Sequence, residues 1–167
     1  MINLDSETPN TWRSAARATL QELERKSEAV YNEEPERHLV SLTDFFVLIA
    51  GQPKNKILHE LETLSLYAVR ALINRDEWDK DQLSLLLTQK QHDYGVGNIL
   101  AFGIDGILVR MSDKVARLKN LQGKNARNES LIDTLTDIVG YAVVATMLDN
   151  ETFFIKELGL GIDDELV

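Results

Sequence analysis

The sequence predicts an all-α protein, folded as one bundle of five or six helices. Apolar residues recur every three or four positions along most of the chain, which is the spacing of one helix face. Runs of alternating β-branched residues bounded by turn dipeptides, which are typical of strands, are missing. The three prolines lie in the first third, each where a helix could begin, at Pro9, Pro35 and Pro53.

The first 91 residues are expected to form four helices, over 9–31, 35–50, 53–74 and 79–91. Thr8 is the expected N-cap of the first helix, and Gly51 closes the second. Each helix has an apolar stripe that is expected to face inward: Trp12, Ala16, Leu20 and Leu23; Leu39, Leu42, Phe45, Phe46 and Ile49; Ile57, Leu61, Leu64, Ala68 and Leu72; Leu83, Leu86 and Leu87.

Two longer helices are expected beyond the last proline, over 96–121 and 129–148, joined by a polar turn at Gly123. Asn128 is the expected N-cap of the second. Their inward stripes are Ile104, Leu108, Met111, Val115 and Leu118, and then Leu131, Leu135, Ile138, Ala142 and Ala145. We see no internal repeat, and residues 150–167 form an acidic tail. The sequence therefore predicts a single helical domain over residues 1–167.

Composition excludes several classes of function. The chain has 167 residues, a formal net charge of −9 and no cysteine. This acidic balance argues against a partner that is a nucleic acid polymer, because phosphate contacts need a basic surface. The lack of cysteine excludes disulfides, thiolate metal sites and a cysteine nucleophile. The sequence has no run of 18 apolar residues and begins unlike a signal peptide, so we expect a soluble, cytoplasmic protein without membrane contact.

The charge is unevenly distributed along the chain. Residues 1–89 carry a balance of −5, residues 90–127 carry +4, and residues 128–167 carry −8. A basic segment therefore precedes a strongly acidic one, and the short turn between them is expected to make their helices antiparallel neighbours.

The acidic segment carries a stripe of carboxylates at Glu129, Asp133 and Asp137, four residues apart on one helix face. One interpretation is a solvated acidic face. The other is a metal site, because both faces of this helix carry apolar residues and carboxylates away from water need a cation. Oxygen ligands without His or Cys suit Mg²⁺ or Mn²⁺.

The preceding helix supplies the opposite charge through Arg110, Lys114 and Arg117, with Asp113 among them. One interpretation is a structural network of ion pairs between these arginines and the carboxylates of the last helix. The other is a phosphate site, because the rigid guanidinium fork matches phosphate oxygens.

These residues carry a resemblance to a known family. The ordered elements lie within residues 90–148: Lys90-x-x-Asp93-Tyr94-Gly95, Phe102, Gly106, Arg110-x-x-Asp113-Lys114-x-x-Arg117-Leu118, Glu129-Ser130-x-x-Asp133-Thr134-x-x-Asp137 and Gly140-Tyr141-Ala142. The segment resembles the helical nucleotide-modification-associated domain 1 of phage and bacterial proteins, which is similar to MazG-like nucleotide pyrophosphohydrolases. Residues 1–89 match no family that we recognise.

The resemblance implies a MazG-like all-α fold and Mg²⁺-dependent hydrolysis of a nucleoside triphosphate to a monophosphate and pyrophosphate. It assigns metal binding to Glu129, Asp133 and Asp137, and catalysis to Arg110, Asp113, Lys114 and Arg117. It places Lys90, Asp93 and Tyr94 at the mouth of the site, where they would bind the nucleotide with Arg110 and Arg117. It also implies a homodimer or homotetramer.

Two alternatives stay open. The chain has no clean copy of the first acidic motif of those enzymes, Glu-Glu-x-x-Glu. A non-catalytic protein that binds or sequesters nucleotides on the same scaffold would need no such motif. The second alternative is a structural helical module in which the charged residues only stabilise the fold.

Overall fold

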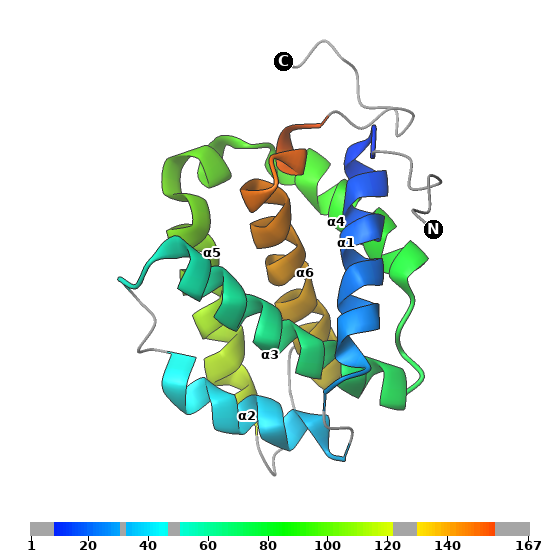
Figure 1. The fold of residues 1–167 in the computed structure, drawn as a ribbon, viewed down its shortest axis with the longest axis vertical. Coiled ribbons are helices and arrows are strands. Elements are labelled where there is room, and N and C mark those ends of the chain that lie inside the picture. The colour runs from blue at the N-terminus through cyan, green and yellow to red at the C-terminus, as the bar shows by residue number, and fades with distance from the viewer. Residues whose placement is uncertain (1–8, 31–32, 47–50, 122–129, 156–167) are drawn as a thin grey trace, which may run out of the picture.

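The computed structural model describes residues 9–30, 33–46, 51–121 and 130–155. Six α-helices and one short 3₁₀ helix make up the regular structure of these residues (Figure 1), and no strand occurs among them. The predicted all-α bundle is therefore confirmed. In chain order the elements are α1 (Trp12–Ser27), α2 (Pro35–Phe46), α3 (Lys54–Asn74), α4 (Lys80–Tyr94), α5 (Gly97–Asn120), α6 (Leu131–Asp149) and η2 (Thr152–Phe154).

Helix α6 is the central element of the bundle. Figure 1 shows it between α1 and α5, with α3 crossing it, and it packs against all three. It is long and apolar enough to cross a membrane by length and composition, but half of it is buried inside the protein. A helix that packs on several sides needs apolar residues around most of its circumference. Its apolar character therefore serves the core, which includes Leu135, Ile138, Val139, Ala142, Val143, Ala145 and Met147.

Most of the predicted inward stripes are confirmed. The apolar residues expected on α1 and α3 are all buried, and so are those expected on α5 apart from Ile104, which is partly buried. One prediction on α4 was wrong: Leu83 and Leu87 are buried, but Leu86 is 40% exposed. A helix turns about 100° per residue, so adjacent leucines cannot all face the core. The side chains of Phe45 and Phe46, and all of Ile49, lie outside what the structure describes.

Two helix starts differ from the prediction. Helix α1 begins at Trp12, where Thr11 accepts a hydrogen bond from the backbone N–H of Ser14 (3.1 Å). Helix α6 begins at Leu131, where Ser130 accepts one from the N–H of Asp133 (3.0 Å) and the carboxylate of Asp133 accepts one from the N–H of Ser130 (3.3 Å). These reciprocal bonds form capping boxes, which stabilise a helix start more than a lone hydroxyl does. The predicted caps, Thr8 and Asn128, lie outside the described residues.

A break in α5 escaped the sequence analysis. Gly103 has φ 55° and ψ −143°, a left-handed backbone conformation that interrupts the helix. Glycine adopts this conformation without the steric cost that a side chain brings. The first turns of α5 therefore take a different direction from the rest.

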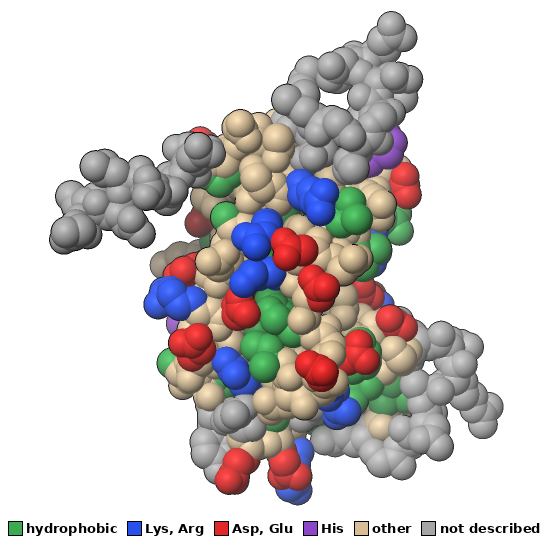
Figure 2. Space-filling view, turned by 90° about the vertical axis from the view of Figure 1, so that its right-hand side faces the viewer, with side chains coloured by type: hydrophobic (Ala, Val, Ile, Leu, Met, Phe, Trp, Pro, Cys, Tyr) green, Lys and Arg blue, Asp and Glu red, His purple; other side chains and the backbone are tan. Residues whose placement is uncertain are grey.

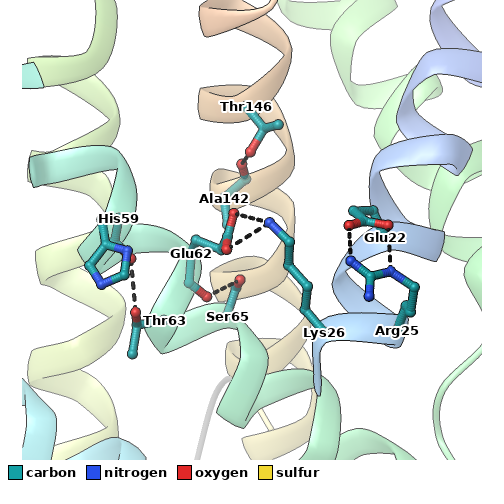
Figure 3. A network of polar contacts seen from close by, with 9 residues as sticks. All are labelled: Glu22, Arg25, Lys26, His59, Glu62, Thr63, Ser65, Ala142 and Thr146. Carbon is teal, nitrogen blue, oxygen red and sulfur yellow. Dashed lines mark hydrogen bonds and ion pairs between the residues drawn. The ribbon is translucent and has the colours of Figure 1, made fainter. Parts of the chain in front are cut away.

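Ion pairs link α1 to α3 and α4. Lys80 of α4 donates to Glu24 of α1 (2.7 Å), and Lys26 of α1 donates to both carboxylate oxygens of Glu62 on α3 (3.0 and 3.2 Å; Figure 3). In Figure 2, which views the side that lies on the right in Figure 1, basic and acidic side chains are interspersed around a small group of hydrophobic side chains. Charges on this face are therefore largely balanced locally.

Candidate functional site

A pocket of about 290 Å³ opens between the start of α1, the second half of α4, α5 and the middle of α6. It contains both charged and apolar side chains. The residues that line it are Trp12, Leu87, Lys90, Gln91, Tyr94, Ile99, Ile107, Arg110, Lys114, Asp137, Gly140, Tyr141 and Val144.

Among the described residues, Asp137 is the only acidic one in this lining, against three basic ones. The Lys114 ammonium lies 2.7 Å from its Oδ2, and the Lys90 ammonium lies 3.4 Å from its Oδ1. The side chains of Asp137 and Lys114 are only 23% and 19% exposed. Arg110 adds a third positive charge from the exposed side of α5. The lining therefore has a formal charge of +2, which suits an anion.

A glycine on α6 allows the walls of the pocket to approach each other. A Cβ atom added at Gly140 would lie 2.9 Å from Cδ2 of Leu87, so a side chain there would push against α4. Leu87 and Lys90 lie one turn apart on α4, as do Gly140 and Asp137 on α6. The close approach at Gly140 thus helps to bring Lys90 within reach of Asp137.

The other end of the pocket is apolar and aromatic. Val144 lies seven residues beyond Asp137, about 10 Å further along α6. Trp12 packs against Phe153, which follows α6, with ring centroids 6.1 Å apart, so the indole lies near the same end of that helix. Trp12 is 3% exposed, and its indole N–H is buried without a hydrogen-bond partner among the described residues. A buried donor left without a partner is costly, and an acceptor on a bound ligand would satisfy it.

Tyr141 lies between the two ends. Its removal from water raises the pKa of its hydroxyl above 10, and the nearby carboxylate of Asp137 raises it further. The hydroxyl is therefore protonated at neutral pH and can donate a hydrogen bond to a ligand.

The structure brings together five of the residues that sequence reasoning placed in the site: Lys90, Tyr94, Arg110, Lys114 and Asp137. Four other described residues do not line the pocket. Asp93 and Asp113 are exposed, Arg117 donates to Thr134 Oγ1 (3.0 Å), and Asp133 caps α6. Glu129 lies outside the described residues.

The expected ion pairs between arginines and carboxylates take a different form. In the described part of the chain, it is lysines that pair with Asp137, and Arg117 hydrogen-bonds to Thr134. Lys114 on α5 contacts Asp137 directly. Arg117 lies about one turn beyond Lys114 on the same helix.

The carboxylates of α6 give a metal ion little to bind on their own. Asp137 is held by two lysines, and Asp133 is an exposed capping residue. No cluster of three or more His, Asp or Glu side chains suited to a metal occurs among the described residues. A site for Mg²⁺ would therefore need Glu129 or another group from outside those residues, together with release of the lysines.

Sequence reasoning missed the apolar half of the pocket. Trp12 lies 78 residues before Lys90, and its spacing marks it only as a core residue of α1. Ile99, Ile107 and Val144 also look like core residues in the sequence. The place of Trp12 in the wall of the pocket is visible only in the structure.

A second pocket, also of about 290 Å³, lies between α1, α3 and the end of α6. Its charged lining consists of Glu22, Lys26 and Glu62, and Figure 3 shows these side chains with their partners. Lys26 pairs with Glu62, and Glu22 pairs with Arg25. Every charge in this lining therefore has an opposite charge beside it.

Compared with models of known protein families, with curated proteins and with solved structures, the chain matches none.

Proposed function

We propose that this protein binds a nucleotide in the pocket between α1, α4, α5 and α6. One observation carries the proposal: Lys90 and Lys114 pair with one carboxylate at one end of the pocket, with Arg110 in the same lining, and aromatic and apolar side chains line the other end. A nucleotide has the same division, with a phosphate at one end and a planar base at the other. Lys114, Lys90 and Arg110 would bind the phosphate, because charge-assisted hydrogen bonds to phosphate are strong.

Calorimetric titration with nucleoside mono- and triphosphates, in the presence and absence of Mg²⁺, tests this proposal. Lys114→Met should weaken binding by about tenfold or more, because it removes one charge-assisted hydrogen bond. Lys80→Met is the matched control. Lys80 makes a 2.7 Å ion pair with Glu24, as Lys114 does with Asp137, but Lys80 lies outside the pocket. Equal affinity of the two variants for every nucleotide bound would contradict the proposal.

Hydrolysis of nucleoside triphosphates is the second candidate, and the position of Asp137 in the pocket favours it. Asp133 lies one turn before Asp137 on α6, and with Glu129 the three would supply the oxygen ligands of Mg²⁺. The metal would polarise the phosphate and activate water. Arg110 and Lys114 would stabilise charge that develops on the phosphate oxygens.

Pyrophosphate release from a panel of nucleoside triphosphates with Mg²⁺ separates the two candidates. Release that is lost in Asp137→Asn would support hydrolysis. Nucleotide binding without release of pyrophosphate would support the first candidate and contradict hydrolysis. If neither Mg²⁺ nor any nucleotide raises the melting temperature, both proposals fail and the charged cluster is structural.

We also infer that the protein works in the cytoplasm of a bacterium or of a cell infected by a phage, where nucleotides are abundant. The homodimer or homotetramer implied by the resemblance stays a prediction. Light scattering of the purified protein would test it.

A further inference from the structure

We propose that the pocket selects the dianionic phosphate of a nucleoside monophosphate over the longer chain of a triphosphate. This inference rests on the proposed function and names the ligand class of that site. It follows from the balance of charge in the lining, from the position of that charge and from the size of the pocket.

The charge of the lining matches a phosphate monoester. Lys90, Lys114 and Arg110 contribute three positive charges and Asp137 one negative charge, which leaves +2. A phosphate monoester carries close to −2 above its second pKa of about 6. A triphosphate carries about twice that charge, and its excess would have no counterpart among the residues of this lining.

The ion-paired charges lie at one end, and Arg110 lies one turn from Lys114 on α5. Asp137 and Lys114 are in contact, and Lys90 reaches the other oxygen of the same carboxylate. Beyond them, one and two turns along α6, come Tyr141 and Val144, and Trp12 lies near the end of that helix. One phosphate fits beside the lysines while the nucleoside extends over the apolar end. A chain of three phosphates would have to extend across apolar wall or out into solvent.

The volume of the pocket also favours a nucleoside monophosphate. At about 290 Å³ the pocket is at the lower limit of typical small-molecule sites, which range over roughly 300–1,000 Å³. The aromatic side chains of Trp12 and Tyr141 line it as well. The pocket therefore has room and partners for one phosphate and one nucleoside.

Calorimetry without metal tests this inference with three probes that share a base and a sugar: AMP, 3′,5′-cyclic AMP and ATP. The cyclic diester has one ionisation and stays a monoanion. At pH 7.5 AMP should bind about tenfold more tightly than cyclic AMP, as expected for one further charge-assisted interaction, and it should also bind more tightly than ATP. If adenine proves a poor base, the guanine, cytosine and uracil sets replace it.

The pH dependence gives a second readout. Between pH 5 and pH 7.5 the monoester gains its second charge, so AMP should bind more tightly at the higher pH while cyclic AMP should not change. The charged and titratable groups facing the ligand are Lys90 and Tyr94 on α4, Arg110 and Lys114 on α5, and Asp137 and Tyr141 on α6.

Arg110→Gln is the test variant. It lowers the charge of the lining from +2 to +1, and it changes a side chain that is exposed rather than part of the core. It should reduce the preference for AMP over cyclic AMP, whereas Arg37→Gln, on helix α2 and outside the lining, should not. Binding of ATP that is as tight as that of AMP or tighter, or equal binding of AMP and cyclic AMP, would overturn the inference and leave the proposed function intact. If none of the nucleotides binds, the proposed function itself fails.

Discussion

The two pockets beside α6 have the same volume but different charge. The pocket between α1, α3 and the end of α6 is lined by Glu22, Lys26 and Glu62, each paired with an opposite charge. In the pocket between α1, α4, α5 and α6, Lys90 and Lys114 share Asp137, and Arg110 adds a further positive charge to the lining. Paired charges need no ligand, whereas an excess of one sign within a half-buried space attracts a counter-charge. The comparison shows that charge balance, rather than volume, distinguishes the candidate site.

The largest expected effect comes from removing one carboxylate in each pocket. Asp137→Asn removes the carboxylate that Lys90 and Lys114 share and should lower the free energy of unfolding by about 1–2 kcal/mol. Glu62→Gln removes a single, more exposed pair and should cost about 0.5–1 kcal/mol. Urea denaturation measures both.

The same pair of variants separates binding from metal chemistry. Asp137→Asn raises the formal charge of the lining, so nucleotide affinity without metal should be kept or increased. A loss of this affinity in Asp137→Asn, or an equal loss in Glu62→Gln, would show that the contrast between the pockets has no functional meaning.

The next effect concerns Asp133, which the sequence places beside Asp137 in one set of carboxylates. Because its carboxylate caps the backbone N–H of Ser130, Asp133→Ala should destabilise the protein by about 1 kcal/mol. Asp133→Asn keeps an acceptor oxygen and should cost less. Thermal denaturation measures the difference, and calorimetry should find nucleotide affinity unchanged in both. Weaker metal-free binding in Asp133→Asn would place this residue in the site.

The smallest effect is the ionisation of Tyr141. Burial raises the pKa of its hydroxyl above 10, so its absorbance should change at a higher pH than that of a free tyrosine. Above pH 10 the unfolded chain loses this proton first, and the contribution of Tyr141 to stability therefore falls as pH rises. Spectrophotometric titration of the protein and of Tyr141→Phe isolates this tyrosine. A difference spectrum centred at pH 10 or below would show that the pocket is open to water at this point.

How much the sequence predicted depends on the kind of information. Periodicity reveals which residues face the core, and it placed the stripes of α1 and α3 correctly. It does not reveal where a capping box begins a helix, so the first residues of α1 and α6 were misplaced. The break at Gly103 was missed because a glycine inside an apolar run has the same pattern whether the helix continues or not.

The charged half of the site was within reach of the sequence, and the apolar half was not. Lys90, Arg110, Lys114 and Asp137 lie within 48 residues and carry a visible imbalance of charge. Their pairing could not be predicted, because it depends on how closely α4 and α5 approach α6. Trp12 joins them only through packing between distant segments, which no spacing rule describes.

The central claim, that the first pocket holds a nucleotide, is tested most directly by the two tryptophans. Trp12 and Trp78 both have a buried indole N–H without a partner among the described residues, but only Trp12 lines the pocket. Each tryptophan has one indole N–H and so gives one indole signal in a ¹H–¹⁵N correlation spectrum. The variants Trp12→Phe and Trp78→Phe assign the two signals. On titration with AMP, the signal of Trp12 should shift progressively to saturation while that of Trp78 stays in place. A saturating shift of Trp78 alone, or no shift of either signal at AMP concentrations that saturate calorimetry, would contradict the claim.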